Sequence, residues 1–304
     1  MHKPPTWKIA AALAVVYVIW GSTYLAIRIG VETIPPLLMA GVRQTAAGLL
    51  LYAWLRGRGV ARPERVHWRS AAIVGALMLL VGNGGVCWAE KYVPSGLTAL
   101  LVATMPLWMV LLEWLWHGAA RPSARIVCGL TLGFVGTGLL VAPGRFGGGS
   151  HVDPKGALAL FAATVAWAAG SLYSRRARLP KSALLSAAME MTAGGGLLLV
   201  ASALLGEWGG SALATASARS VGAMVFLIVF GSMVAYSAYM WLMKVTTPAR
   251  ASTNAYINPI VAVVLGWWVA GEPVTARIAV AAGVIIVGVI LIISHRPPPP
   301  AEIA

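Results

Sequence analysis

Long apolar runs, separated by short polar or basic segments, make up most of the chain. Ten of these runs approach the roughly twenty residues that an α-helix needs to cross the hydrocarbon core of a bilayer. They cover residues 9–27, 36–55, 70–88, 95–116, 125–141, 156–173, 182–205, 220–243, 249–269 and 277–293. This pattern predicts an all-α integral membrane protein with ten transmembrane helices.

The fourth and ninth runs each contain a proline inside an otherwise apolar stretch. Pro106 interrupts the fourth run, and Pro259 interrupts the ninth, where Asn254 and Asn258 precede it. In hydrocarbon an unpaired polar group is costly, and a proline leaves a helix carbonyl without its donor. Paired, interrupted spans in corresponding halves of a chain are typical of the central site of a transporter. We predict that both prolines act in gating and that these spans face protein or a water-filled cavity.

The ten spans divide into two sets of five. Several residues recur at a nearly constant spacing: Lys91 and Lys244 lie 153 residues apart, as do Pro106 and Pro259, while Arg125 and Arg277 lie 152 apart, as do Gly136 and Gly288. Because each set has an odd number of spans, the second set must cross the membrane in the opposite sense. The sequence therefore predicts a 5+5 inverted-topology repeat around a central cavity. We expect residues 9–141 and 156–293 to form the two five-helix repeats, with residues 294–304 as a cytoplasmic, proline-rich tail.

Composition and charge agree with a membrane protein. Apolar residues make up 59% of the chain, charged residues only 11%, and the mean hydropathy is +0.80; soluble domains carry roughly 25% charged residues. The net charge of +14 lies in short loops between spans, which argues against nucleic-acid binding. With the N-terminus inside, sixteen of the 23 Lys and Arg residues fall on the cytoplasmic side and six on the other. The positive-inside rule therefore predicts a multi-pass membrane protein with both termini cytoplasmic.

Aromatic and amide residues inside the spans are the candidate substrate contacts. Trp20 and Tyr24 are four residues apart and share a helix face, as do Asn254 and Asn258. The full set predicted to bind substrate is Trp20, Tyr24, Asn83, Met105, Trp108, Trp167, Ser171, Tyr236, Tyr239, Asn254 and Asn258. Rings and amides together suit small zwitterions with an apolar side chain. The competing interpretation is that such aromatic residues anchor span ends at the interface and that the amides join neighbouring helices.

Three charged residues fall inside spans: Arg43, Glu113 and Glu190. A charge within a membrane span is a functional candidate because leaving it uncompensated is costly. Arg43 and Glu190 occupy equivalent places in the two repeats, and one hypothesis is that they pair. Each could instead snorkel to the interface or bond to backbone, and a carboxylate relay for protons through Glu190 or Glu113 is a further possibility.

The chain resembles the EamA family of the drug/metabolite transporter superfamily, which includes bacterial amino-acid and metabolite exporters. The resemblance is carried by Trp20-Gly21-Ser22, by the two span prolines and by Gly271-Glu272-Pro273. The corresponding segment of the first half, residues 118–122, lacks the glutamate. The resemblance implies a basket of ten helices around a cavity lined mainly by spans 1, 3, 4, 6, 8 and 9.

We therefore expect a secondary transporter of the bacterial inner membrane that exports small metabolites, amino acids above all, including apolar and aromatic ones. A carrier for drugs or nucleoside-like metabolites is the alternative; a passive channel or an intramembrane enzyme fits less well. No catalytic set is visible, the histidines lie in loops, tails or span ends, and neither an ATP motif nor a metal-binding spacing occurs. We expect no enzyme activity and no cofactor. The expected partners are a small-molecule substrate and the lipid bilayer, not nucleic acid, and the sequence leaves the oligomeric state open.

Overall fold

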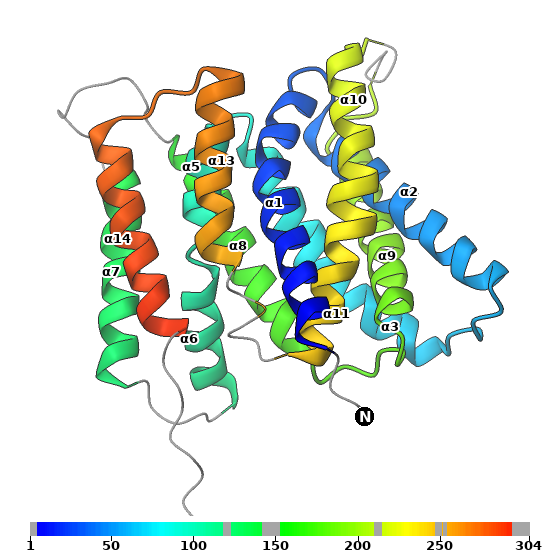
Figure 1. The fold of residues 1–304 in the computed structure, drawn as a ribbon. Helices are drawn as coiled ribbons and strands as arrows, with labels where there is room; N and C mark the ends of the chain where they lie inside the picture. Colours follow the sequence, from blue (N-terminus) through cyan, green and yellow to red (C-terminus); the bar gives the residue numbers. More distant parts are fainter. Residues whose placement is uncertain are drawn as a thin grey trace, which may run out of the picture.

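The computed structural model describes residues 5–117, 123–141, 153–209, 215–246, 251 and 254–293. Within these ranges the chain forms ten helical spans that run up and down (Figure 1). The first five are α1 (Thr6–Gly30), α2 (Pro36–Gly57), α3–η1–α4 (Arg65–Val74, Gly75–Asn83, Gly84–Ala89), α5–α6 (Ser95–Val102, Met105–His117) and α7 (Ala124–Val141). The second five are α8 (Pro154–Ser174), α9 (Ala183–Leu204), α10–η2–α11 (Ala218–Phe226, Leu227–Tyr236, Ser237–Val245), α13 (Asn254–Ala270) and α14 (Ala276–Ile293).

Six of the spans are long and apolar enough by themselves to cross a membrane: Thr6–Gly30, Arg65–Ala89, Ser95–Trp116, Pro154–Ser174, Ala183–Leu204 and Ala218–Val245. Shorter apolar helices in α7, α13 and α14 accompany them. With α2, these make ten helical spans, and the predicted all-helical membrane fold with ten helices is confirmed. The loops at residues 118–122 and 142–152 and the tail from residue 294 lie outside the described residues, as do residues 249–250 and 252–253 of the predicted ninth span.

Local sequence explains where several helices begin and end. Asp153 accepts a hydrogen bond from Lys155 N at the start of α8, and Ser182 and Ser217 cap α9 and α10 in the same way. Such side chains satisfy backbone N–H groups that have no partner inside the helix. Gly59 and Gly206, which follow α2 and α9, adopt positive φ angles of 80° and 74°, a conformation that glycine reaches without strain. These two glycines are 147 residues apart, the same spacing as Arg43 and Glu190.

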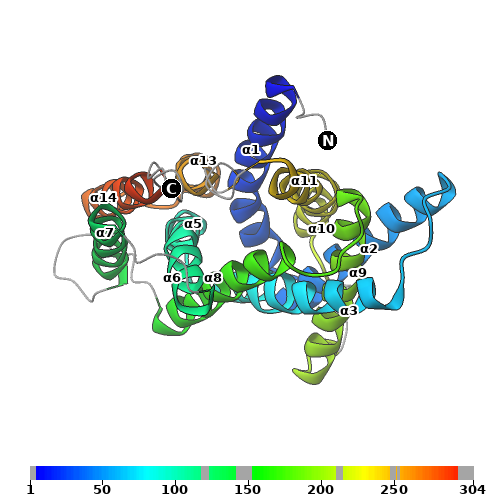
Figure 2. The same cartoon turned by 90° about the horizontal axis from the view of Figure 1, so that it is seen from below.

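The helices pair as a two-fold repeat requires. Three of the five pairs of equivalent spans are in contact: α2 with α9, α7 with α14, and α5 with α13. In addition, α1 packs against α13 as α8 packs against α6. Likewise α1 packs against α10, η2 and α11, while α8 packs against α3, η1 and α4. Figure 2 shows α7 and α14 side by side at one edge and the α2–α9 pair on the opposite side of the bundle.

Small residues at the α2–α9 contact repeat this symmetry residue by residue. A Cβ on Gly48 would lie 2.5 Å from Thr192 N, and a Cβ on Gly195 would lie 2.4 Å from Thr45 N. The two glycines are 147 residues apart, and so are the two threonines. Each helix therefore places a glycine against a threonine of the other helix. Helices in membranes approach closely through such residues.

The α7–α14 pair shows the same reciprocity. A Cβ on Gly136 would meet Ile285 and the Ala281 carbonyl, at 2.6 and 3.1 Å. A Cβ on Gly288 would meet the backbone of Gly129 and Gly133, at 2.7 and 2.9 Å. The Gly-x-x-x-Gly face of the fifth span is therefore used for packing within the chain.

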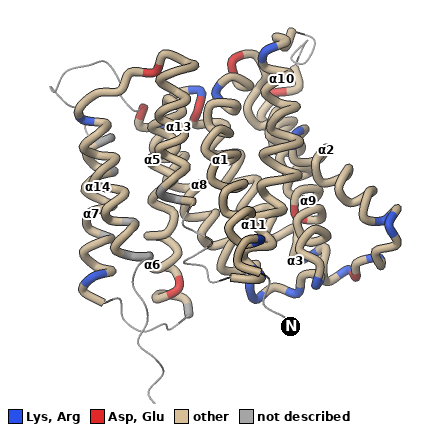
Figure 3. Tube along the Cα trace, viewed as in Figure 1, with Lys and Arg blue, Asp and Glu red and all other residues tan. Residues whose placement is uncertain are grey.

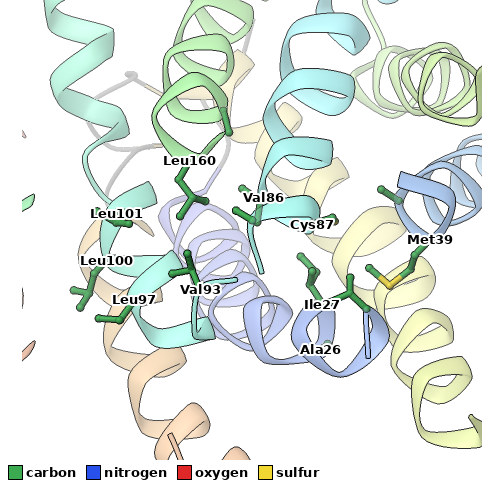
Figure 4. Packing of buried hydrophobic residues seen from close by; sticks show 14 of the residues in the cluster. Ala26, Ile27, Met39, Val86, Cys87, Val93, Leu97, Leu100, Leu101 and Leu160 are labelled. Carbon is green, nitrogen blue, oxygen red and sulfur yellow. The ribbon is translucent and has the colours of Figure 1, made fainter. Parts of the chain in front are cut away.

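Apolar side chains from both repeats fill the space between spans. One cluster joins Ala26 and Ile27 of α1, Met39 of α2, Val86 of α4 and Leu160 of α8 (Figure 4). The third and eighth spans each contain a π-helical segment, η1 and η2, in the middle of the membrane-spanning run. These segments end at Asn83 and Tyr236, which are 153 residues apart. Single π-helical turns occur frequently at functional sites.

Lys and Arg residues gather at the end of the bundle where the α2–α3 connection lies, the end nearest the N-terminus (Figure 3). That end also receives residues 175–181 after α8. The opposite end carries the starts of α2 and α5 and the end of α13. We refer to the two as the basic end and the far end; assigning the basic end to the cytoplasm stays a prediction.

Candidate functional site

A cavity of about 80 Å³ lies where the two repeats meet. Seven spans contribute to it: α1, α2, the third span, the fourth span, α8, the eighth span and α13. The lining residues are Trp20, Thr23, Tyr24, Ile27, Arg43, Gln44, Asn83, Val86, Val102, Met105, Trp167, Gly231, Tyr236, Asn254 and Asn258.

The structure brings eight of the eleven predicted contact residues to this cavity: Trp20, Tyr24, Asn83, Met105, Trp167, Tyr236, Asn254 and Asn258. Two pairs among them occupy equivalent repeat positions, Asn83 with Tyr236 and Met105 with Asn258, each 153 residues apart. The cavity therefore lies on the pseudo-two-fold axis. That these residues bind substrate stays a prediction.

The other three predicted residues do not line the cavity. Tyr239 lies behind its wall, with its ring 4.9 Å from the Trp20 ring, and its hydroxyl is 3.3 Å from Ser171 Oγ. Trp108 turns elsewhere, because its ring packs edge-on against Phe134 and Phe161. Helical spacing alone could not distinguish the face toward the cavity from the face toward a neighbouring helix.

Trp20 is held at the cavity wall by a hydrogen bond and by contacts with neighbouring rings. Its indole Nε1 donates to the Gly231 carbonyl at 3.2 Å, inside π-helical segment η2, and its ring meets Trp167 edge-on at 5.8 Å. Aromatic pairs in this arrangement are favourable beyond the area they bury. The cavity consequently has a pre-formed aromatic side on which an apolar group can rest.

Amide side chains form a polar side of the cavity. Gln44 Nε2 lies 3.4 Å from Asn83 Oδ1, while Gln44 Oε1 and Asn254 Oδ1 are buried and have no hydrogen-bond partner among the described residues. Asn258, with its amide nitrogen turned to the available acceptors, donates to the Tyr17 and Asn254 carbonyls, each at 3.2 Å. Two amide oxygens of residues that line the cavity are thus left to accept.

Arg43 adds a positive charge to the same lining. Its side chain is 3% exposed, and its Nε donates to Ser232 Oγ at 2.9 Å. Its Nη1 is buried without a hydrogen-bond partner among the described residues. Gly231 leaves the space that the guanidinium occupies, since a Cβ there would lie 3.0 Å from Arg43 Nη2.

Glu190 does not pair with Arg43, so that hypothesis is wrong. Glu190 is fully buried, and its Oε2 accepts a hydrogen bond of 2.7 Å from Tyr236 Oη, while Oε1 has no partner among the described residues. Arg43 is directed to Ser232 instead. The third predicted charge, Glu113, lies toward the basic end, in a second hollow shared with Leu172, Arg175 and Arg176.

The two prolines sit differently in their spans. Pro259 lies inside continuous helix α13. Pro106 is the second residue of α6, directly after a turn at Ala103 and Thr104 that separates α5 from α6. A proline in the first turn of a helix removes no needed donor, whereas one in the interior does. A gating role for either residue stays a prediction.

Acidic residues fasten the two repeats together at the far end. Glu272 accepts from Ser95 N and Ser95 Oγ, both at 2.8 Å, and from Gly96 N at 3.0 Å, so it caps the N-terminus of α5. Glu207 accepts from Leu38 N at 2.8 Å and so caps α2. Both carboxylates belong to the second repeat, and both caps are on helices of the first.

Glu90, the first residue after α4, is a buried acid that sequence reasoning missed. Neither of its carboxyl oxygens has a partner among the described residues. Burial, and then the neighbouring Glu272, raise the pKa of the Glu90 carboxyl well above its ordinary value. Its position beside Lys91 is typical of a loop, and no sequence signal marks it as buried.

Sequence reasoning also missed the contribution of the second span. The family resemblance implied a cavity without it, yet Arg43 and Gln44 of α2 both reach the lining. One signal was present: a charged residue inside a span usually faces the protein interior or a cavity rather than lipid.

Comparisons with known proteins agree on the class of this chain. The EamA-like transporter family matches residues 7–142 and again residues 154–294. The uncharacterized inner membrane transporter YedA of Escherichia coli (strain K12) is 41% identical over 282 residues, covering 92% of this chain and 89% of YedA. The uncharacterized transporter YvbV of Bacillus subtilis (strain 168) is 26% identical over 300 residues, covering 96% of this chain and 93% of YvbV. A solved crystal structure has the same fold, with a TM-score of 0.67 at 21% identity, covering 94% of this chain and 96% of that one.

Proposed function

Since this chain belongs to the EamA-like transporter family, we propose that it is a secondary transporter of the bacterial inner membrane that exports small metabolites, amino acids above all. Apolar and aromatic amino acids are included in this proposal. YedA, a relative with matching length, is named an inner membrane transporter, which supports the location. The chain has no ATP-binding motif, so a gradient or the substrate itself supplies the energy.

One observation carries the substrate proposal: a single cavity between the repeats has an aromatic side and a polar side. Trp20, Tyr24 and Trp167 offer surface to an apolar side chain, while Asn83, Asn254 and Asn258 offer hydrogen bonds to a charged head group. Small-molecule sites combine apolar walls with a few placed polar groups in this way. A free amino acid has both parts.

The mechanism we propose is alternating access. The two repeats are in inverted orientation and enclose the cavity, so rocking one against the other exposes it first to one side and then to the other. The basic end would face the cytoplasm, which places both termini there. Pro259 would let α13 bend during this movement.

The decisive experiment is counterflow in proteoliposomes. Vesicles that contain the purified protein are loaded with unlabelled amino acids and diluted into an equimolar mixture of the twenty labelled standard L-amino acids; parallel samples use labelled nucleosides and a lipophilic drug cation. We expect saturable exchange with the amino acids only. Repeating the assay with and without a pH gradient tests coupling.

Two variants and two negative outcomes sharpen this test. Trp20→Ala and Asn258→Ala should change the half-saturation concentration for amino acids, and normal curves in both would remove these residues from the site. Flux that neither saturates nor shows counterflow would indicate a channel. Exchange of nucleosides or cations without amino acids would overturn the substrate proposal.

A further inference from the structure

Three polar side-chain atoms that lack hydrogen-bond partners belong to residues that line the cavity, and they form a complementary set. Arg43 Nη1 is a charged donor, and Gln44 Oε1 and Asn254 Oδ1 are neutral acceptors; all three are buried and have no hydrogen-bond partner in the described part of the chain. Their residues line the same cavity of about 80 Å³. Buried polar groups nearly always have hydrogen-bond partners in folded proteins. Three such groups without partners, on residues around one cavity, therefore point to a ligand that supplies the missing hydrogen bonds.

The arginine is the most telling member of this set. A buried, unpaired charge at membrane depth is costly, which makes it a functional-site candidate by default. In the described residues no carboxylate forms an ion pair with Arg43, and Ser232, its neutral partner, occupies only Nε. Glu90, the buried acid after α4, has no hydrogen-bond partner for either carboxyl oxygen among the described residues, so it does not bond Arg43. A planar guanidinium with free N–H groups is suited to a carboxylate.

The charge of the lining supports the same conclusion. No Asp or Glu is among the residues that line the described cavity. Glu190 is not among the lining residues, and its Oε2 accepts a hydrogen bond from Tyr236, which is. A cationic ligand without a carboxylate would therefore meet an uncompensated arginine and no countercharge.

We infer that Arg43 is the carboxylate anchor of the transport site and that the Gln44 and Asn254 amide oxygens receive the ammonium of the same ligand. This inference deepens the proposed function, on which it rests, because it names the recognised group: the zwitterionic head of a free α-amino acid. The Trp20 and Trp167 rings then contact the side chain. Amines, amides and esters of the same amino acid are excluded by the loss of the anchor.

A four-compound binding series tests the head-group requirement without relying on transport. Thermal stabilisation of the purified protein is measured with L-phenylalanine, 3-phenylpropionate, L-phenylalaninamide and phenethylamine, and apparent dissociation constants are derived. Losing one partner of a buried charge pair costs enough to weaken binding about thirtyfold or more. We expect phenylalanine to bind best, 3-phenylpropionate about tenfold more weakly because it loses only hydrogen bonds to neutral acceptors, and the two carboxylate-free compounds to be the weakest.

Variants assign each half of the head group. Arg43→Gln should weaken phenylalanine binding about thirtyfold or more and abolish the preference for phenylalanine over phenylalaninamide; Arg43→Lys should restore part of that preference. Gln44→Met should weaken phenylalanine but leave 3-phenylpropionate unchanged. The matched control is Arg56→Gln, which removes an arginine from the same helix, outside the cavity, and should change none of these values.

The outcomes separate this inference from the proposed function. Equal binding of phenylalanine and phenylalaninamide, an unchanged preference in Arg43→Gln, or binding of none of the four compounds would overturn the anchor assignment. Amino-acid exchange in the counterflow assay could still stand in each of these cases. Failure of counterflow with an intact carboxylate preference would instead overturn the transport proposal and leave the binding site.

Discussion

The two repeats share one backbone plan but differ in chemistry at equivalent positions. Arg43 and Glu190 occupy the same place in α2 and α9, yet Arg43 lines the cavity while Glu190 lies behind Tyr236. Asn83 and Tyr236 both end π-helical segments at the cavity, one as an amide and the other as a phenol. The two repeats therefore have the same helix arrangement, but different side chains at equivalent positions give the cavity one charged side.

The interhelical glycines show the opposite behaviour, because there the two copies are alike. Gly48 faces Thr192 as Gly195 faces Thr45. Where two helix backbones lie this close, only small residues fit, so the two repeats keep the same residues. A cavity wall can accept side chains that differ between the repeats. The following experiments test this difference between helix contacts that are alike in the two repeats and a cavity lining that is not. The largest expected effect comes first.

Gly195→Val should abolish the folded protein or lower its stability by about 3 kcal/mol or more, because the new side chain would enter the backbone of α2. Gly48→Val should be equally severe. The adjacent Gly196 has open space around it, so Gly196→Val is the matched control and should be nearly neutral. Thermal unfolding in detergent measures all three, and equal melting temperatures for the two neighbouring substitutions would contradict the packing described here.

Removing the charge of Arg43 and removing the charge of Glu190 should have different effects on transport, and exchanging the two residues should not restore it. Arg43→Gln should weaken amino-acid exchange strongly, whereas Glu190→Gln, which keeps an acceptor for Tyr236, should leave the half-saturation concentration within a few-fold. The charge-swapped double variant, Arg43→Glu with Glu190→Arg, should be as inactive as its worse single change, because the two side chains do not pair. Recovery of exchange in the double variant would restore the pairing hypothesis.

Glu90 and Met243 form another equivalent pair, with an acid in one repeat and a buried apolar residue in the other. Because the pKa of Glu90 is raised in the folded state, its protonated form contributes stability at low pH that is lost as pH rises through the folded-state pKa. Glu90→Met should therefore stabilise the protein, by about 1–3 kcal/mol at alkaline pH, with a smaller gain in acid. Melting temperatures across a pH series measure this, and a gain that grows toward acid pH would contradict it.

Pro259→Ala should give the smallest effect, a several-fold loss of turnover at unchanged stability, because the helix interior would regain a hydrogen bond and stiffen. Pro106→Ala should change turnover less, since Pro106 already stands at the start of α6. Counterflow at saturating amino acid, with melting temperature as the folding control, distinguishes the two. Unchanged transport in Pro259→Ala would refute its gating role.

Much of this architecture could be predicted from the sequence. Apolar runs and proline landmarks sufficed for ten helices in two sets of five, because the bilayer imposes length and composition directly. The cavity was harder. Eight predicted contacts reach it, but Trp108, Ser171 and Tyr239 face neighbouring helices, and Arg43 and Gln44 were not expected there. Which side of a uniformly apolar helix faces inward depends on packing partners, and a single sequence does not contain that information. The π-helical segments left no sequence signal that we can identify.

The carboxylate caps of Glu207 and Glu272 have a consequence for how the molecule can move. Each carboxylate joins a loop of the second repeat to the first turn of a helix in the first repeat, and both contacts lie at the far end of the protein. Parting the repeats at that end would break several charge-assisted bonds at once, whereas no comparable bridge spans the described part of the opposite end. Because these bonds join the repeats only at the far end, they should favour a resting conformation that is open at the basic end. This is the end that our proposal places in the cytoplasm, where an exporter binds its substrate.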